Sequence, residues 1–435
     1  MIVGYSNGFH DAGMTVIDDC NIIYAGHSER YSRIKNDKLH SNLMPKYTGH
    51  LTAFYEKPFL KNLRRLYAGQ KWKKREIYDW YCHHHWSHAA AAYYTRPFSE
   101  EPVCVVIDAI GEWDTATIWY KKKKKWSLRY PQSLGLFYSA ATKAVGLKPM
   151  EDEYILMGMS AYGKPIHTYD CFLNYHKGGT FVGRPEDVAA SAQYLIEQNI
   201  SKIMQKAKKY SDYLCYGGGV ALNCVANTKI QPMFKDVWIM PNPGDAGSSL
   251  GAAAAMQDKM LNWIDPYLGY NIERELNVKE VVSHLLEHSY CGVANGRAEF
   301  GPRALGNRSL LADPRRDIKD TVNQIKRRQK FRPFAPAILE EYAGQYFEGP
   351  MNQYMQYVAK AKHDYSSVTH VDGTARVQLV KQDCKSIIRP VLEEWYEQTG
   401  CPMLLNTSLN IKGQPIVNNE SHAREFEKKY NVRVF

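Results

Sequence analysis

The pattern of apolar and polar positions predicts the same series of strands twice within the first 130 residues. Residues 1–6 predict a strand, and a polar turn and two further short strands, 14–17 and 22–26, follow. The series restarts with a strand at 103–108 and a turn at 109–114, before a strand, a lysine-rich turn and another strand. Two copies of one strand series predict duplicated half-domains that face one cleft.

Helical periodicity and glycine-rich turns follow the second series. Residues 133–147 and 185–209 carry apolar or small side chains at helix spacing. Residues 214–223 predict a strand that ends in three glycines, and the Pro-Gly turn of 241–251 precedes a close-packed helix at 252–256. Backbone N–H groups at such glycines can approach a phosphate or a sugar. Strands that alternate with helices predict an α/β fold.

The periodicity is lost between residues 261 and 279, where aromatic residues, prolines and charges mix. We therefore expect two domains, residues 1–265 and residues 275–435. A chain of 435 residues with 44% apolar residues is long enough for both domains to have a core.

The composition of the chain indicates in which cellular compartment the protein is expected. No stretch approaches the roughly 20 apolar residues that a membrane-spanning helix needs, and residues 1–6 are typical of a strand rather than of a secretion signal. The nine cysteines are scattered without a C-x-x-C pair, which is typical of reduced thiols. We therefore expect a cytoplasmic protein with no membrane partner.

The net charge of +11 is compatible with a polyanionic partner. Five of the positive residues form one block, Lys121 to Lys125, which lies between two alternating segments and predicts a solvated hairpin tip. Others lie in arginine-rich motifs, where a phosphate-bearing small molecule would need them. The charge alone does not decide between a nucleic acid and such a molecule.

Four histidines between positions 83 and 88 form the candidate metal site. His84 and His88 are four residues apart, so a helix places them on one face, where they supply two of the imidazoles that a transition metal requires. Asp245 in a Pro-Gly-Asp turn is the best further ligand by type, and Asp108 is the next. The alternative is a histidine cluster that caps a surface helix.

A run from Gly296 to Arg316 spaces Arg297, Arg303 and Arg308 among glycines and a proline. Arginine beside rigid turns aims a planar guanidinium at phosphate oxygens. A solvated basic face is the alternative, but a free surface helix would not contain so many helix-breaking residues. Three later segments share this character: 330–336, 369–378 and 405–410.

From the His10-Asp11-Ala12 turn to Asn410, these collinear motifs make the chain resemble the O-carbamoyltransferases of nodulation and antibiotic pathways. The resemblance implies an N-terminal actin-like ATPase domain, which is a duplicated RNase H-like fold, and a C-terminal YrdC-like α/β domain. The duplicated strand series agrees with the first of these.

The resemblance also implies the reaction. Carbamoyl phosphate and ATP, with Mg²⁺ as an expected companion of ATP, would give carbamoyl adenylate in the C-terminal domain. Lys330 and Arg332 would act in catalysis there, and Ser408 and Asn410 would hold the nucleotide and the acyl group. A clamp on the phosphates would be completed by four arginines: Arg297, Arg303, Arg308 and Arg376.

The carbamoyl group would then pass, in the N-terminal domain, to a hydroxyl or an amine of a small molecule, sugar or nucleotide. The resemblance implies Fe(II) or another divalent metal on His84, His88 and Asp245, with Asp108 as a further ligand. His10, by its residue type either a satisfied polar group or a general base, would deprotonate the acceptor. The adenosine part would lie at three further residues: Gly217, Gly218 and Asn223.

The chain departs from the family pattern in three places. The N-terminal domain is short, Ala109 stands where a glycine is expected after Asp108, and Ala298 replaces a larger apolar residue. Two alternatives stay open, namely the same chemistry on a nucleic-acid acceptor and an inactive nucleotide-binding scaffold. A homodimer is compatible with the sequence.

Overall fold

The computed structural model describes all of the chain except residues 9–10, 40–44, 47–49, 75, 168–174 and 176–180. It divides into two compact units, residues 1–28 with 38–264 and residues 29–37 with 265–435. The short segment 29–37 belongs to the second unit because its arginines hold that unit's backbone. Arg30 donates to the Gly301 carbonyl at 3.0 Å, and Arg33 donates to the Ile416 carbonyl at 2.6 Å.

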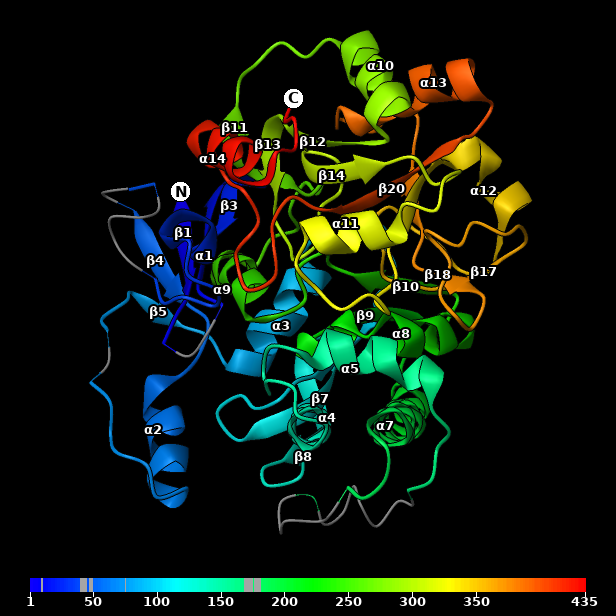
Figure 1. Cartoon of the computed structure of the whole chain (residues 1–435). Coiled ribbons are helices and arrows are strands. Elements are labelled where there is room, and N and C mark those ends of the chain that lie inside the picture. The colour runs from blue at the N-terminus through cyan, green and yellow to red at the C-terminus, as the bar shows by residue number, and fades with distance from the viewer. Residues whose placement is uncertain (9–10, 40–44, 47–49, 75, 168–174, 176–180) are drawn as a thin grey trace. The chain divides into compact units, whose positions relative to one another are not determined.

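The first unit contains two five-stranded sheets with one strand order (Figure 1). In each sheet the first three strands form an antiparallel meander, and the last two run parallel to the first strand. The order is β3-β2-β1-β4-β5 in one sheet and β8-β7-β6-β9-β10 in the other. The strands of the first sheet are β1 (Ile2–Ser6), β2 (Gly13–Asp18), β3 (Asn21–His27), β4 (Leu51–Phe54) and β5 (Trp80–Tyr81). Those of the second are β6 (Val103–Ile107), β7 (Asp114–Tyr120), β8 (Lys123–Arg129), β9 (Tyr213–Gly217) and β10 (Asp236–Ile239).

The predicted duplication and the α/β class are therefore confirmed, and the repeat extends beyond the meanders. One helix follows each sheet, α3 (His84–Tyr93) after the first and α9 (Ser248–Gln257) after the second. The two helices pack on each other, α3 against strands of the second sheet and α9 against strands of the first. Close contact requires glycine at position 251, where a Cβ would lie 1.7 Å from the Ser87 carbonyl oxygen.

The remaining helices of the first unit connect strands. Helix α2 (Pro58–Tyr67) joins β4 to β5, and α8 (Cys224–Ile230) joins β9 to β10. The predicted helical segments appear as α4 (Leu134–Ala144) and α7 (Pro185–Lys208), with α5 (Glu153–Met159) between them. Their apolar side chains form the main core of this unit with the inner strands of the second sheet.

The lysine-rich hairpin is confirmed with a shifted turn. Lys121 and Lys122 adopt positive φ angles of 50° and 59°, as in the tight turns that match strand twist, while Lys123 already belongs to β8. Lys122 forms an ion pair with Asp258, and Lys124 pairs with Asp114 at 2.7 Å. Part of the positive block is therefore neutralised within the unit.

The second unit is built on a mixed five-stranded sheet in the order β12-β14-β20-β15-β19. These strands are β12 (Tyr290–Ala294), β14 (Arg308–Ala312), β20 (Met403–Ser408), β15 (Ala335–Leu339) and β19 (Gln378–Val380). One face packs against α10 (Val278–His288) and α13 (Ile388–Thr399), the other against α11 (Lys319–Ile325) and α14 (Glu420–Tyr430). Consecutive residues alternate between the faces, so Leu310 joins one core and Leu311 the other.

Smaller elements complete the second unit. The segment α1 (Glu29–Ser32) lies in the stretch that the first half of the chain contributes. A two-stranded sheet pairs β11 (Tyr267–Ile272) with β13 (Gly296–Glu299), and a three-stranded one joins β16 (Phe347–Glu348), β17 (Ala359–Ala361) and β18 (Thr374–Ala375) beside α12 (Glu340–Tyr346). Within the described part of the chain, no helix is both long enough and apolar enough to cross a membrane.

Candidate functional site

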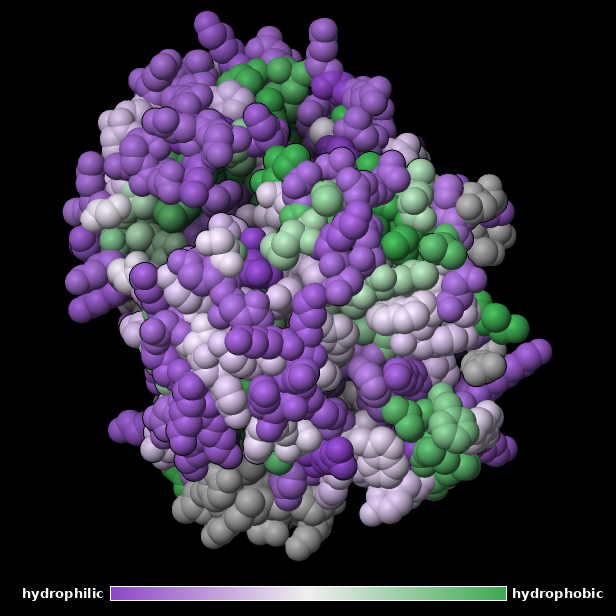
Figure 2. Space-filling view, turned by 180° about the vertical axis from the view of Figure 1, so that it is seen from behind, coloured by the Kyte–Doolittle hydropathy of each residue, from purple (hydrophilic) through white to green (hydrophobic). Residues whose placement is uncertain are grey.

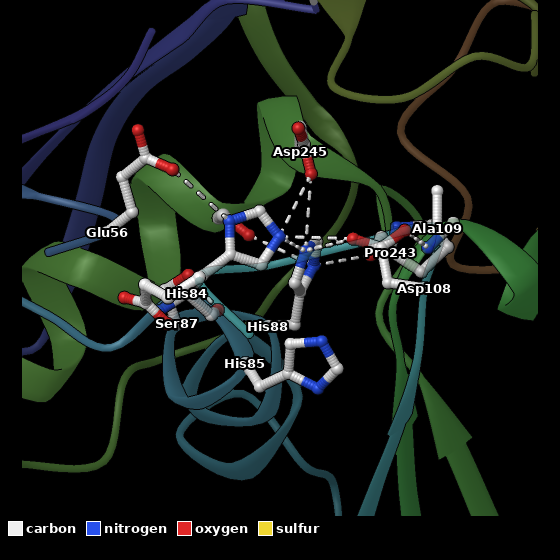
Figure 3. Close-up of polar contacts among 12 residues, drawn as sticks. Glu56, His84, His85, Ser87, His88, Asp108, Ala109, Pro243 and Asp245 are labelled. Atoms are coloured by element: carbon white, nitrogen blue, oxygen red, sulfur yellow. Dashed lines mark hydrogen bonds and ion pairs between the residues drawn. The ribbon is translucent and has the colours of Figure 1, made fainter. Parts of the chain in front are cut away.

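Four buried side chains of the first unit converge on one point (Figure 3). One ligand atom from each of His84, His88, Asp108 and Asp245 lies within 4.8 Å of the other three. The two Nε2 atoms are 3.1 Å apart, and Asp108 Oδ2 lies 3.1 Å from Nε2 of His84. Asp245 Oδ1 lies 3.3 Å from Nε2 of His88. We call this group the His–Asp cluster.

Both halves of the duplicated fold contribute to the His–Asp cluster. The two histidines occupy the first turns of α3, Asp108 directly follows β6, and Asp245 precedes α9. The backbone amide of Gly219 donates to Asp108 Oδ1 at 3.1 Å, which orients that carboxylate. The cluster is thus assembled at the start of the paired central helices and at the ends of strands of the second sheet.

The start of α3 is held by a buried carboxylate from another element. Glu112 Oε1 accepts hydrogen bonds from the backbone amides of His84 at 3.0 Å and Lys57 at 2.8 Å. A carboxylate at this end satisfies a free N–H group and favours the helix dipole. Glu112 therefore fixes the helical turn that carries both histidines.

The outer nitrogen of each histidine faces an oxygen atom outside the cluster. Nδ1 of His88 lies 2.9 Å from the Pro243 carbonyl, which can only accept, so Nδ1 carries the hydrogen and Nε2 keeps its lone pair. Nδ1 of His84 lies 3.8 Å from Oε2 of buried Glu56, whose other oxygen pairs with Lys61 at 2.6 Å. Carbonyls and carboxylates behind histidines are the usual supports of metal-ligating imidazoles.

The electrostatics of the cluster favour bound positive charge. Burial alone would lower the pKa of His84, but Asp245, Asp108 and Glu56 outweigh burial and hold that pKa well above its usual value. Burial would likewise raise the pKa of Asp108, whereas the two histidines hold it well below. Two carboxylate oxygens and two imidazole nitrogens at this spacing fit a divalent transition metal.

The other two histidines of the motif do not join the cluster. His85 is buried and turned away, with Nδ1 3.0 Å from Thr117 Oγ1 (Figure 3). Burial, helped by the neighbouring His84, lowers the pKa of His85 to about 3, so the ring stays neutral. His83 is half-exposed, and its Nδ1 lies 3.9 Å from Glu112.

In the second unit, a buried lysine gathers two of the predicted ligand-holding residues. Nζ of Lys326 lies 3.0 Å from both the carbonyl and the Oδ1 of Asn410, and it also donates to the Ser408 carbonyl. Burial, with Arg328, Arg332 and Lys35, lowers the pKa of Lys326 well below its usual value. We call Lys326, Arg328, Arg332 and Lys35 the cationic cluster.

Comparison with known proteins gives matches over most of the chain. A model described as the carbamoyltransferase N-terminus matches residues 45–184 and 177–254, and one described as the carbamoyltransferase C-terminus matches residues 282–435. Nodulation protein NolO of Bradyrhizobium diazoefficiens is 31% identical over 78% of this chain and 75% of its own length. The chain belongs to the carbamoyltransferase family. It is therefore a transferase enzyme.

Other similarities extend this result. Nodulation protein NolNO of Sinorhizobium fredii is 32% identical over 78% of this carbamoyltransferase, which covers 60% of that protein. An uncharacterised Synechocystis protein is 28% identical over 96% of the chain and 92% of its own length, in an alignment of 568 positions. That alignment has more positions than the 435 residues of this chain, so the Synechocystis protein contains segments that have no counterpart in this carbamoyltransferase.

Solved structures show weak likenesses to the chain. HypF in its phosphate- and nucleotide-bound form has a TM-score of 0.38 and 12% identity over 59% of this chain and 55% of that one. The archaeal actin homologue Ta0583 in complex with ADP has a TM-score of 0.33 and 11% identity over 60% of this chain and 100% of that one.

Two arginines that the sequence predicts as phosphate ligands donate hydrogen bonds to backbone carbonyls. Arg308 is fully buried, and its guanidinium donates to five carbonyls, those of Tyr270, Asn295, Gly296, Asn307 and Asn418. Arg297 donates to the carbonyls of Leu268 at 2.6 Å and Gly269 at 3.4 Å. A buried guanidinium satisfies its donors with nearby carbonyls, and sequence spacing does not reveal such partners. A phosphate-binding role for these two arginines stays a prediction.

Lys330, which the sequence predicts as catalytic, and Lys326, which it did not single out, have different surroundings. Lys330 is exposed and pairs with Asp320 at 2.9 Å, whereas Lys326 reaches Ser408 and Asn410. Lys326-Arg-Arg328 has the same Lys-x-Arg spacing as Lys330-Phe-Arg332, and this repeated spacing is the signal that could have found it.

The remaining residues that the sequence predicts as nucleotide-binding or catalytic lie in different surroundings. Gly218 has a φ of 90°, and a Cβ there would lie 2.3 Å from the Ile107 carbonyl oxygen, so glycine is required next to Gly217 for packing on β6. Asn223 caps α8 and bonds Gln193 at 3.0 Å. Arg303 and Arg376 are half-buried. His10 lies outside the described residues.

Proposed function

We propose that this carbamoyltransferase uses ATP to activate carbamoyl phosphate and transfers the carbamoyl group to a hydroxyl group of a small molecule. In the proposed sequence, carbamoyl phosphate is hydrolysed to carbamate and phosphate, and carbamate attacks the α-phosphorus of ATP. Pyrophosphate leaves, and carbamoyl adenylate forms. The acceptor oxygen then attacks the carbamoyl carbon, AMP leaves, and the hydroxyl proton passes to a base.

The observation that carries the proposal is the His–Asp cluster inside a member of this family. His84, His88, Asp108 and Asp245 would hold Fe(II) or another divalent ion. Such an ion would polarise the carbamoyl carbonyl and favour the acceptor alkoxide. The buried surroundings would exclude water, which would otherwise hydrolyse the activated carbamoyl group. His10 stays a candidate for the base that accepts the proton.

Activation is assigned to the second unit on the strength of the cationic cluster. The charged groups that depress the Lys326 pKa are all cations, so this buried amine calls for an anion. Phosphate groups of ATP or carbamoyl phosphate would provide that charge, with Mg²⁺ as the companion of ATP. We propose Lys326 and Arg332 as the groups that stabilise charge developing on phosphorus, with Ser408 and Asn410 orienting the lysine.

A YrdC-like second unit and an actin-like first unit would place these two steps in separate parts of the chain. A small acceptor is preferred over a nucleic acid because two lysines of the basic hairpin already pair with Asp258 and Asp114. Either acceptor would use the same activation step.

The test is transfer by metal-loaded and metal-free enzyme. Protein stripped with a chelator and reloaded with Fe(II), Co(II) or Zn²⁺ is incubated with ATP, carbamoyl phosphate and a panel of sugars, nucleosides and small alcohols. Products are screened by mass for the gain of one carbamoyl group. We expect transfer only with loaded protein, and equal transfer by stripped protein would exclude the role of the His–Asp cluster.

A further inference from the structure

Helix α2 of the first unit turns its apolar face to solvent. Phe59, Leu63, Leu66 and Tyr67 have exposed fractions of 58%, 39%, 51% and 71%. Their spacing of i, i+4, i+7 and i+8 places them on one face of the helix. An amphipathic helix ordinarily buries this face against its own core, so the orientation of α2 is reversed.

The polar face of α2 holds the reversed orientation. Lys61 pairs with buried Glu56 at 2.6 Å, and Arg65 donates to the Lys71 carbonyl at 3.0 Å. Asn62 is buried and exchanges two hydrogen bonds with the backbone of Lys73, at 2.8 and 3.1 Å. Turning the apolar face inward would break these contacts and leave the Glu56 carboxylate buried without its partner.

The segment after α2 enlarges the exposed apolar face. Trp72 is 50% exposed, and its ring lies 6.0 Å from that of Phe59. We call Phe59, Leu63, Leu66, Tyr67 and Trp72 the α2 apolar surface. In Figure 2 apolar side chains gather at the place of α2, low on the right of that view. In the described part of the chain no other helix or strand packs extensively on α2, and contiguous exposed patches of this kind mark interaction sites.

The charge around this surface indicates its partner. Residues 57–74 contain seven Lys and Arg and no Asp or Glu, and Lys71, Lys73 and Lys74 are exposed beside Trp72. Helices with aromatic and leucine side chains on one face and many basic residues beside it bind anionic lipid interfaces. We propose that the α2 apolar surface docks reversibly on an anionic phospholipid bilayer.

Other occupants fit the surface less well. A second copy of the chain on a two-fold axis would bring two equally basic segments together, which like-charge repulsion disfavours. A nucleic acid would suit the lysines and could stack on the three rings, but it would leave Leu63 and Leu66 without the apolar surroundings that a lipid interface provides. The absence of a spanning segment predicted no membrane partner, but a peripheral contact requires no such segment.

The test is flotation of the full chain with vesicles of phosphatidylcholine alone and with phosphatidylcholine containing one third phosphatidylglycerol. We expect binding to the anionic vesicles only, and loss of binding in about 1 M salt, where the screening length is about 3 Å. The double variant Leu63→Ser/Leu66→Ser should bind at least about tenfold more weakly, because it lacks two leucines that the bilayer would bury. Ile264→Ser removes an apolar residue elsewhere in the unit that is more exposed than either leucine, and this variant should bind as the unmodified chain does.

A spectroscopic measurement separates docking from a change of fold. Trp72 fluorescence should shift to shorter wavelength on addition of anionic vesicles, and the shift should be absent in Trp72→Phe, with circular dichroism unchanged in every variant. Three results would overturn the proposal. The first is no binding to anionic vesicles, and the second is equal binding by the double-serine variant. The third is a dimer or a nucleic-acid complex that forms without vesicles and is lost in the double-serine variant, while vesicle binding is not.

Discussion

The ligand atoms of the His–Asp cluster are set by residues that are not ligands themselves. Pro243 fixes the tautomer of His88 through its carbonyl, and Glu56 lies behind His84. The cluster therefore depends on two kinds of residue, those whose loss removes a metal donor and those whose loss misdirects one.

Loss of a donor is tested with His84→Ala. We expect the metal affinity of this variant to fall at least about a hundredfold, because one of four ligand atoms disappears. Loss of a supporting residue costs less, about 10- to 100-fold. Isothermal titration of the stripped protein with Co(II) measures it. His83→Ala is the matched control, since His83 is half-exposed and outside the cluster, and an equal loss in both variants would contradict the assignment.

Loss of support is tested with Glu56→Gln, which keeps the size of the side chain and removes its charge. Metal affinity should fall about 10- to 100-fold, and the visible spectrum of the Co(II)-loaded protein should change, because His84 is no longer held by a carboxylate. Lys61→Gln removes the partner of Glu56 but keeps the carboxylate. If the Lys61 variant lost as much affinity as the Glu56 variant, the ion pair rather than the Glu56–His84 contact would be responsible.

The cationic cluster gives a prediction that distinguishes two lysines four residues apart. Lys326→Met should reduce carbamoyl phosphate-dependent pyrophosphate release about a hundredfold or more, because the amine that we propose to stabilise charge on the phosphates is removed. Lys330→Met should keep most of the activity, since Lys330 is exposed and pairs with Asp320. The opposite result would restore the assignment first made from sequence.

At the scale of elements, the His–Asp cluster depends on how closely α3 and α9 approach each other. A Cβ at position 251 would lie 1.7 Å from the Ser87 carbonyl oxygen, between the two cluster histidines in the sequence of α3. Gly251→Ala should therefore push the helices apart, with a cost of about 1–3 kcal/mol in the free energy of unfolding and weaker metal binding. Thermal unfolding measures the first effect. Gly344→Ala, where a Cβ meets nothing within 4 Å, should have little effect.

The elements also show what sequence patterns can predict. Strand alternation predicted the duplicated meanders, and the four-residue spacing predicted a helix face shared by His84 and His88, because both depend on local periodicity. The pairing of β4, β5, β9 and β10 was not foreseen, since parallel strands meet only through long connections. The outward orientation of α2 was not predicted for a related reason. The spacing of its apolar residues shows that one face of the helix is apolar, but not whether that face points toward the core or toward solvent.

Contacts between residues distant in the sequence could not be predicted from local patterns. Arg308 matched a phosphate-binding pattern, but its five carbonyl partners lie on segments up to 110 residues away. The segment 29–37 belongs to the second unit through Arg30 and Arg33, which no periodicity reveals. Family resemblance predicted a role for Ser408 and Asn410, and only the structure shows that Lys326 is the lysine beside them.

For the whole molecule, we propose that activation takes place in one unit and transfer in the other. A chain with two separate sites should tolerate damage to one without loss of the chemistry at the other. The division of labour is therefore open to a direct kinetic test with a variant of the His–Asp cluster.

The decisive measurement is pyrophosphate release from ATP by His84→Ala, with and without carbamoyl phosphate and with no acceptor present. We expect this variant to release pyrophosphate at the rate of the unmodified enzyme, only when carbamoyl phosphate is added, while carbamoyl transfer to any acceptor is lost. Loss of pyrophosphate release in this variant, or no dependence on carbamoyl phosphate in the unmodified enzyme, would contradict the two-site account.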